Sequence, residues 1–305
     1  MNHKQIYIFS ESFKSELIEE VKRLDLKILE TTEQMLVIEN GKLEPAWAQC
    51  VWNDVQTIDF ISIADAQKKL KAISKKWNYY GELFFRRGKL ISETLEAKNQ
   101  KKEIEFIVEE GDKKISYPVF TMAGQNSIYY SERLSRPTVD GKIFFSENKL
   151  EPPSRAYLKL WEALTLLGDY PKKNERVIDL GSAPGSWTWV LAELEAKVHS
   201  IDRSQLDLDL NKYKNIKFEA RDVFELKPEK VDWLFSDVIC YPDRLFQYVS
   251  KWMDSGFCKK FVCTLKFKGK PDYEVIECFR KLPHSRVVHL YHNKNEVTWI
   301  SHPSL

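Results

Sequence analysis

The chain has 305 residues, of which 43% are hydrophobic and 13% aromatic, and its formal net charge is +2. This length predicts two or three compact domains, and the composition is that of a globular protein. No apolar run approaches the roughly 20 residues that cross a bilayer, so a membrane span is not expected. The N-terminus turns polar too early for a secretory signal, and five cysteines, an odd number, fit a reducing cytoplasm. No metal site is expected, because the cysteines and histidines lack paired ligand spacing.

The first sixty residues predict a small α+β unit. A strand over 5–9 is followed by a helix over 12–24 and by strands over 26–32 and 34–40. Asn40 and Gly41, at the end of the last of these strands, form a turn signal.

Residues from about 64 to 147 predict a second α+β module. One helix covers 64–77, and the strand-like segments that follow it cover 103–110, 114–120 and 127–131. The connector 147–155 contains two consecutive prolines, which cannot continue a helix or a central strand, so it marks a domain boundary.

Basic and aromatic residues occur together in three places, 67–77, 84–89 and 266–270. Such mixtures suit a surface that touches phosphates and bases. Taken singly, each cluster is more simply explained as a charged face in contact with solvent. The net charge of the chain argues neither for nor against a polyanionic partner.

After Ser154 the pattern changes to an alternation of strands and helices. Helical candidates separate the first six of seven β-rich runs, which predicts a doubly wound, Rossmann-like and mainly parallel sheet. The last two runs are separated only by 293–295, too short for a parallel crossover, so the last strand is expected to be antiparallel. The seven runs are 175–180, 197–202, 216–222, 231–238, 260–267, 285–292 and 296–302.

The segment "DLGSAPGSW", residues 179–187, follows the first of these strands, where ligands bind in a doubly wound sheet. Gly181 and Gly185 let the backbone approach a ligand, Pro184 fixes a bend, and the following helix directs its amide donors at a carboxylate. The G-x-x-x-G spacing differs from the G-x-G-x-x-G of dinucleotide sites.

Two acidic strand ends favour a ligand with an adenosine and an amino-acid end. Asp202 ends the second strand, where a carboxylate can accept both ribose hydroxyls, and Asp222 ends the third, within reach of an adenine amino group. Each aspartate alone is equally well a turn or helix N-cap residue.

At these residues the chain resembles the FtsJ-like S-adenosylmethionine-dependent methyltransferases, which carry D-L-G-x-x-P-G-G-[WF] in this loop and methylate ribose 2′-hydroxyls of RNA. The resemblance covers roughly 154–302. It implies a catalytic set of Lys159, Asp237, Lys266 and Glu296. It also implies that S-adenosylmethionine is bound by Asp179, Gly181, Ser182, Pro184, Gly185, Ser186, Trp187, Asp202, Asp222 and Asp237.

The chemistry of methyl transfer supports the same four catalytic residues. A ribose hydroxyl is a poor nucleophile at neutral pH, so a base must take its proton. An amine can do so only if its pKa falls from about 10.4 toward 7 or 8, and burial beside a second ammonium lowers it. We assign Lys266 as the base and Lys159 as the residue that tunes it, while Asp237 and Glu296 orient the amines.

Ser186 departs from the family pattern, which has a second glycine there. Serine is a favoured helix N-cap, so we expect it at the entry to the helix, with its hydroxyl directed at the ligand carboxylate. Trp187 matches the family's aromatic residue, and Trp189 is expected to pack in the core.

The long N-terminal region narrows the resemblance to the RlmM-type enzymes, which methylate a cytidine of 23S ribosomal RNA. It implies a ferredoxin-like unit over 1–60, a THUMP-like RNA-binding module over 61–150 and a methyltransferase domain over 151–305. The implied partner is 23S ribosomal RNA or a ribosomal precursor, in the cytoplasm.

Two other functions are compatible with the pattern. One is a non-catalytic RNA-binding factor in ribosome assembly that retains the fold, which the four intact catalytic positions disfavour. The other is a methyltransferase for a small molecule or a protein, which the basic and aromatic clusters disfavour.

Overall fold

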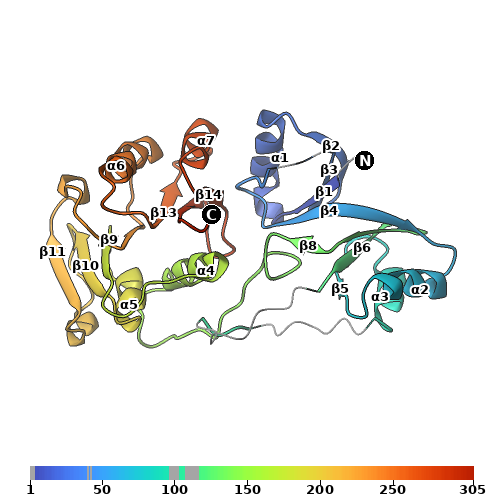
Figure 1. The fold of residues 1–305 in the computed structure, drawn as a ribbon, viewed down its shortest axis with the longest axis horizontal. Coiled ribbons are helices and arrows are strands. Elements are labelled where there is room, and N and C mark those ends of the chain that lie inside the picture. The colour runs from blue at the N-terminus through green and yellow to red at the C-terminus, as the bar shows by residue number, and fades with distance from the viewer. Residues whose placement is uncertain (1–3, 40, 42, 96–102, 107–116) are drawn as a thin grey trace. The chain divides into compact units, whose positions relative to one another are not determined.

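The computed structural model describes residues 4–39, 41, 43–95, 103–106 and 117–305. The chain divides into two compact units, Met1–Phe144 and Phe145–Leu305 (Figure 1). The predicted domain start at residue 151 lies within the second unit. The division of the first unit into modules over 1–60 and 61–150 stays a prediction.

The first unit is built on one eight-stranded sheet in which β4 connects two groups of strands, in the order β2-β3-β1-β4-β7-β6-β5, with β8 paired to β4. The strands are β1 (Lys4–Ile8), β2 (Lys27–Thr31), β3 (Met35–Glu39), β4 (Cys50–Asp59), β5 (Asn78–Tyr79), β6 (Val119–Gly124), β7 (Ser127–Ser131) and β8 (Arg133–Leu134). The helices are a 3-10 turn η1 (Glu11–Phe13), α1 (Lys14–Arg23), α2 (Ile63–Ile73) and α3 (Phe85–Ser92).

The long strand β4 is absent from the sequence prediction. It pairs with β1 through its first half and with β7 through its second half, so it joins the two groups. The polar residues Asn53 and Asp54 interrupt its apolar pattern, and Asp54 has a φ of +51° where the pairing with β1 shifts register. This irregularity hides the strand from a search for regular alternation.

Helix α3 is also absent from the prediction, because it contains Gly88, which weakens a helix. The glycine is required here: a Cβ atom on Gly88 would collide with the ring and hydroxyl of Tyr79. The other predicted elements of this unit correspond to β1, α1, β2, β3, α2, β6 and β7. Three predicted features lie partly or wholly outside the described residues. They are the strand over 103–110, the start of the strand over 114–120 and Asn40 of the turn.

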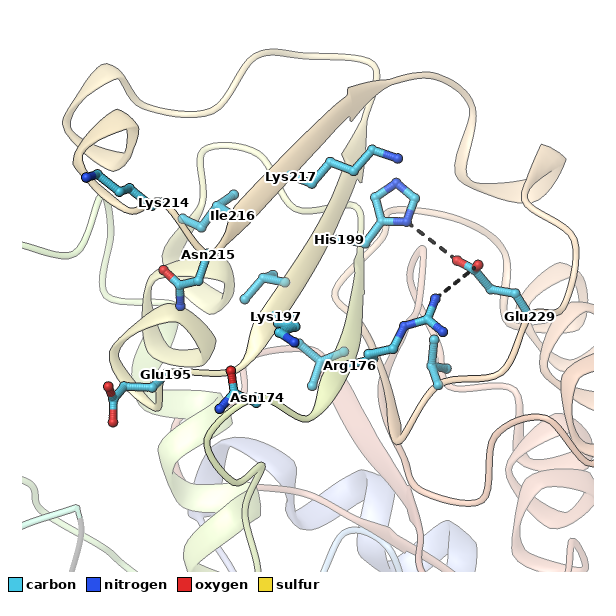
Figure 2. A pocket seen from close by; sticks show the side chains of 13 residues that line it. Asn174, Arg176, Glu195, Lys197, His199, Lys214, Asn215, Ile216, Lys217 and Glu229 are labelled. Atoms are coloured by element: carbon cyan, nitrogen blue, oxygen red, sulfur yellow. Dashed lines mark hydrogen bonds and ion pairs between the residues drawn. The ribbon is translucent and has the colours of Figure 1, made fainter.

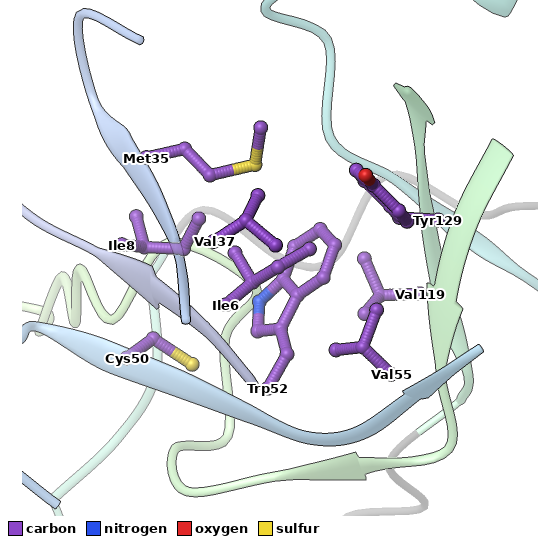
Figure 3. Close-up of a cluster of buried hydrophobic side chains, with 9 residues drawn as sticks. All are labelled: Ile6, Ile8, Met35, Val37, Cys50, Trp52, Val55, Val119 and Tyr129. Carbon is purple, nitrogen blue, oxygen red and sulfur yellow. The ribbon is translucent and has the colours of Figure 1, made fainter. Parts of the chain in front are cut away.

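The first sheet carries a buried hydrophobic cluster on each face, and one of these two cores is drawn in Figure 3. Trp52 lies at its centre, where its ring is fully buried and its Nε1 donates to the backbone oxygen of Val139 at 2.9 Å. On β6 the neighbouring residues Val119 and Phe120 belong to different cores, because successive strand residues point to opposite faces. The core of Phe120 is the one that includes buried residues of α2 and α3.

The second unit contains a seven-stranded sheet in the order β11-β10-β9-β12-β13-β15-β14, in which β15 is the reversed strand. This confirms the predicted doubly wound sheet with an antiparallel last strand. The strands are β9 (Arg176–Leu180), β10 (Lys197–Asp202), β11 (Ile216–Ala220), β12 (Trp233–Ser236), β13 (Phe261–Lys266), β14 (Ser285–Val288) and β15 (Glu296–Ser301). The helices are α4 (Tyr157–Leu167), α5 (Ser186–Glu193), α6 (Pro242–Ser255) and α7 (Tyr273–Arg280).

Two of the expected helical connections are single 3-10 turns, η2 (Leu208–Lys212) between β10 and β11 and η3 (Val223–Glu225) between β11 and β12. Each begins after an aspartate, Asp207 or Asp222, whose side chain accepts a backbone N–H two residues on. The sheet order reverses between β9 and β12, which defines the carboxyl edge where a ligand is expected.

None of the helices in the described part of the chain combines the length and the apolar character needed to cross a bilayer. Within the same residues, no group of three or more histidine, cysteine or acidic side chains is arranged to hold a metal ion. The five cysteines are free thiols.

Candidate active site

The four residues of the implied catalytic set, which we call the Lys-Asp-Lys-Glu cluster, lie together at the carboxyl edge of the second sheet. Lys159 lies on α4, Asp237 follows β12, Lys266 ends β13 and Glu296 begins β15. Because β15 runs opposite to β13, its first residue stands beside the last residue of β13, and Lys266 pairs with Glu296 in the register. The topology thus unites residues up to 137 positions apart.

The amines and carboxylates of the cluster are in direct contact. Lys159 Nζ donates to Asp237 Oδ1 and Oδ2, both at 2.9 Å, and to Glu296 Oε1 at 3.0 Å. Lys266 Nζ donates to the backbone oxygen of Asp237 at 2.5 Å and lies 3.2 Å from its Oδ1. Asp237 therefore contacts both amines.

The two carboxylates of the cluster shift the pKa of Lys159. Burial lowers the pKa of Lys159, but the carboxylates of Asp237 and Glu296 together raise it by more, so its pKa lies above the ordinary value. The assignment of Lys159 as the amine that tunes the base, rather than as the base itself, requires a charged amine and stays a prediction. Lys159 is a cation at neutral pH.

The loop between β9 and α5 needs its two glycines for separate reasons. Gly181 has a φ of +72°, and a Cβ atom there would lie 2.5 Å from the Cα of Val238. Gly185 has a φ of +118°, and its Cβ would collide with Leu210. Pro184 follows a cis peptide bond and accepts the backbone N–H of Asp207 at 2.9 Å. The loop therefore packs closely on the chain after β12 and on η2.

Ser186 does not cap the helix as expected. Gly185 occupies the N-cap position, and Ser186 is the first residue of α5. Its hydroxyl donates to the backbone oxygen of Ser154 at 3.1 Å and lies 2.7 Å from the Ser154 hydroxyl. Trp187 Nε1 donates to the backbone oxygen of Ala156 at 3.0 Å. Both side chains thus fasten the loop to the start of α4 rather than pointing to a ligand.

A cavity of about 310 Å³ opens beside the Lys-Asp-Lys-Glu cluster. Its walls combine three carboxylates that follow or end strands, the glycine loop and one lysine of the cluster. This set suits a ligand with a nucleoside and a reactive centre. These residues include Gly181, Ala183, Asp202, Asp222, Asp237 and Lys266. The cavity volume lies at the lower end of small-molecule sites.

Asp202 is oriented for a diol. Its Oδ1 accepts the backbone N–H of Ser204 at 2.8 Å, and its Oδ2 accepts that of Ala183 at 3.1 Å. Each carboxylate oxygen keeps a second lone pair for a ligand hydroxyl. This geometry fits the ribose of S-adenosylmethionine.

Asp222 is engaged by protein groups. The backbone N–H of Phe224, donated at 3.0 Å, and the guanidinium of Arg203, at 2.5 Å, hold the pKa of Asp222 below its ordinary value. Arg244 lies 3.8 Å away. A ligand amino group at Asp222 would share the carboxylate with these arginines, so the predicted adenine contact stays a prediction.

Asp179 does not reach the cavity. Its side chain is fully buried, its Oδ2 accepts the hydroxyl of Thr188 at 2.6 Å, and Thr188 lies 2.8 Å from the hydroxyl of Ser200. Burial raises the pKa of Asp179 to about 7. The residue holds α5 against the sheet, and its predicted contact with the cofactor has no support from its position.

Ser182, Pro184, Gly185, Ser186 and Trp187 also lie outside the residues that line the cavity. Ser182 is 5% exposed, and its hydroxyl has no hydrogen-bond partner within the part of the chain that the structure describes. A polar ligand group would satisfy that hydroxyl.

The raised pKa of Asp179 makes the stability of the chain depend on pH. Folding raises this pKa from 3.8 to about 7, so the folded state binds the proton more tightly between these values. We expect the free energy of unfolding to fall as the pH rises through this window, on the order of 2–4 kcal/mol in total. Asp179→Asn should remove this part of the pH dependence, which urea titrations at pH 5 and pH 7.5 measure. Parallel pH profiles for both proteins would contradict the assignment.

Glu162 is a site residue that sequence reasoning missed. It lies on α4 one turn after Lys159 and is 1% exposed. Its carboxylate accepts the backbone N–H of Tyr291 at 2.8 Å and that of His292 at 3.0 Å, and its Oε2 lies 2.7 Å from His292 Nδ1. It thus ties the helix that carries Lys159 to the segment that leads to Glu296. Its place at i+3 from Lys159, on the same helix face, was the available signal.

Glu162→Gln should loosen the link between α4, which carries Lys159, and the segment that leads to Glu296. The two backbone N–H groups now use both carboxylate oxygens, whereas an amide offers only one acceptor oxygen. We expect the kcat of methyl transfer to fall about 10-fold, a typical cost of a displaced catalytic group, with little change in the KM for the cofactor. Glu195→Gln, at an exposed ion pair with Lys173, is the matched control. Equal effects on kcat and on thermal stability in both variants would refute the positioning role.

A larger hollow, of about 800 Å³, lies at the opposite edge of the same sheet (Figure 2). It is lined by residues at the start of β9, β10 and β11, among them Arg176, Lys197 and Lys217. Figure 2 shows dashed contacts from His199 and Arg176 to Glu229, so part of its charge is paired internally. It contains none of the predicted site residues.

Residues 152–287 match the family model described as FtsJ-like methyltransferase. Two curated relatives, both named ribosomal RNA large subunit methyltransferase M, come from Pasteurella multocida and Haemophilus influenzae. The first is 34% identical over 169 residues, 49% of this chain and 46% of the relative. The second is 32% identical over 168 residues, 48% of this chain and 46% of the relative. The chain spans about half the length of these relatives.

A solved structure described as a ribosomal RNA methyltransferase, from Plasmodium falciparum, is 18% identical and has a TM-score of 0.38. It covers 49% of this chain and 96% of its own. The family match confirms the resemblance to the FtsJ-like methyltransferases, and it falls on the second unit.

Proposed function

Because residues 152–287 form an FtsJ-like methyltransferase domain, we propose that the chain transfers a methyl group from S-adenosylmethionine to a ribose 2′-hydroxyl of RNA. The observation that carries this proposal is the Lys-Asp-Lys-Glu cluster at the rim of a cavity with a carboxylate suited to ribose. The names of the curated relatives support 23S ribosomal RNA, or its precursor, as the substrate.

S-adenosylmethionine, when bound, supplies a methyl group on a sulfonium that a weak nucleophile can attack. Asp202 would accept its ribose hydroxyls, and Gly181 and Ala183 of the glycine loop line the same cavity. Asp237, between the cavity and both amines, orients the reacting groups.

Lys266 is the proposed acceptor of the 2′-hydroxyl proton. It lines the cavity, and its Nζ is one of the two amines in contact with Asp237. Lys159 serves as a fixed cation, because its raised pKa keeps the proton on its Nζ. That charge offsets the carboxylates of Asp237 and Glu296, which would otherwise repel each other and the substrate phosphates.

The first unit is the proposed RNA-holding part, with a ferredoxin-like and a THUMP-like module. Helices α2 and α3 carry two of the basic and aromatic clusters and lie side by side, where Gln67 Nε2 donates to the backbone oxygen of Leu90 at 3.0 Å (Figure 1). Phe84 and Phe85 are 49% and 55% exposed next to Arg86 and Arg87. Exposed aromatic rings beside cations can stack on RNA bases and contact phosphates. The proposed location is the cytoplasm, a reducing compartment in which the five cysteines stay free thiols.

Incubation of the purified chain with methyl-labelled S-adenosylmethionine and unmodified 23S ribosomal RNA tests the proposal. Label is expected in RNA, in a dinucleotide that resists alkali, because a 2′-O-methyl group blocks attack on the neighbouring phosphate. Label in a base, in protein or in a small molecule would replace this function with another methyl transfer. RNA binding without any label would favour a non-catalytic factor.

A further inference from the structure

The loop that follows Asp237 exposes two large apolar side chains at the rim of the active site. Ile239 is 87% exposed and Tyr241 is 67% exposed, while Cys240 between them is half-buried. Ile239 lines the same cavity as Asp237 and Lys266. Exposed apolar groups gathered beside a site mark a surface that another molecule covers.

Two cations lie on the loop that follows the neighbouring strand β13, at the same edge of the sheet. The loop after β13 carries Lys268 and Lys270, both exposed and without an ion-pair partner in the described part of the chain. Asn295 Nδ2 donates to the backbone oxygen of Gly269 at 2.8 Å, which holds this loop beside the start of β15. Because β12 and β13 are neighbouring parallel strands, both loops leave the same edge of the sheet.

An aromatic ring and an aliphatic side chain next to lysines form a surface that suits a nucleic-acid strand: bases stack on the rings and phosphates meet the cations. A base inside a duplex is already stacked on both faces, so only an unpaired base can use such a surface. A protein partner would have to supply carboxylates of its own to pair with the two lysines.

We propose that Ile239 and Tyr241 form a stacking platform for a base of the substrate, next to or at the methylated nucleotide, with Lys268 and Lys270 at the adjoining phosphates. This inference rests on the proposed RNA methyltransferase function and narrows its substrate to an unpaired stretch of RNA. Tyr241 is a specificity-determining residue in this account.

The test uses the full chain and a short single-stranded oligoribonucleotide that contains 2-aminopurine, whose fluorescence falls on stacking. Tyr241→Ala should weaken binding about 5- to 100-fold and reduce the quenching, because each base–aromatic stack stabilises a complex by this amount. Tyr241→Phe keeps the ring and should bind like the unaltered chain. Phe257→Ala is the matched control, since Phe257 is 49% exposed at the opposite edge, just before β13. All variants should keep their affinity for S-adenosylmethionine.

A Tyr241→Ala protein that binds and quenches the oligoribonucleotide like the unaltered chain would overturn the platform. Equal binding of the same sequence as a duplex would overturn the preference for unpaired RNA. Because binding and quenching need no turnover, these results are distinct from a failure of methyl transfer by the unaltered chain, which would instead count against the proposed function.

Discussion

Lys266→Ala is expected to lower the rate of methyl transfer to RNA by about 10²–10⁴-fold, the range that a positioned general base contributes. The physical reason is that Lys266 is the proposed proton acceptor, with its Nζ 3.2 Å from Asp237 Oδ1 at the cavity wall. Lys159 cannot replace it, because its raised pKa keeps it protonated. Single-turnover assays with labelled cofactor measure the effect, and calorimetry should give an affinity for S-adenosylmethionine close to that of the unaltered chain.

Two further variants decide whether Lys266 acts through its proton or only through its charge. Lys266→Arg keeps a cation but cannot release a proton near neutral pH, so it should be as inactive as the alanine variant. Lys259→Ala, an exposed lysine just before the other end of β13, should leave the rate unchanged. An active Lys266→Arg protein would mean that Lys266 stabilises charge and that another group takes the proton.

Gly181→Ala is expected to destabilise the second unit by about 3–5 kcal/mol and to abolish cofactor binding. The added Cβ atom would lie 2.5 Å from the Cα and 2.8 Å from the backbone nitrogen of Val238, and a backbone atom cannot turn aside as a side chain can. A left-handed φ costs a further 1–2 kcal/mol or so for a residue with a Cβ. The shift would also displace the segment that carries Asp237.

Gly168→Ala separates the two costs, because Gly168 has the same φ of +72° but nothing within 4 Å of its added Cβ. It should lose only about 1–2 kcal/mol, the penalty of the left-handed conformation. Denaturant titrations of both variants measure the free energies of unfolding, and calorimetry measures cofactor binding. If the two variants lose equal stability, close packing of Gly181 on Val238 is not what fixes the loop.

The second sheet was predictable because its strands are short β-rich runs that alternate with helical segments, and because three residues between the last two runs exclude a parallel crossover. The first sheet was harder to predict from the sequence. In β4 the polar pair Asn53 and Asp54 breaks the alternation, and in α3 Gly88 lowers the helix propensity while a tertiary contact with Tyr79 requires it. In both cases packing overrode the local pattern.

For the site, residue types and order predicted which side chains meet but not their electrostatics. The pKa of Lys159 depends on Asp237 and Glu296, which are 78 and 137 positions away, and no local pattern reports such contacts. Serine is a favoured residue type at a helix N-cap, yet Gly185, whose backbone is left-handed, occupies the N-cap position of α5 in place of Ser186. Glu162 was missed because its partners are backbone N–H groups at Tyr291 and His292.

The most direct test of the account is a map of ribose methylation in 23S ribosomal RNA from cells with and without this gene, complemented with the unaltered chain or with Lys266→Ala. One 2′-O-methyl site should disappear with the gene, return with the unaltered chain and stay absent with the lysine variant. An unchanged map, or full restoration by the variant, would contradict the proposal that the cluster of Lys159, Asp237, Lys266 and Glu296 methylates RNA.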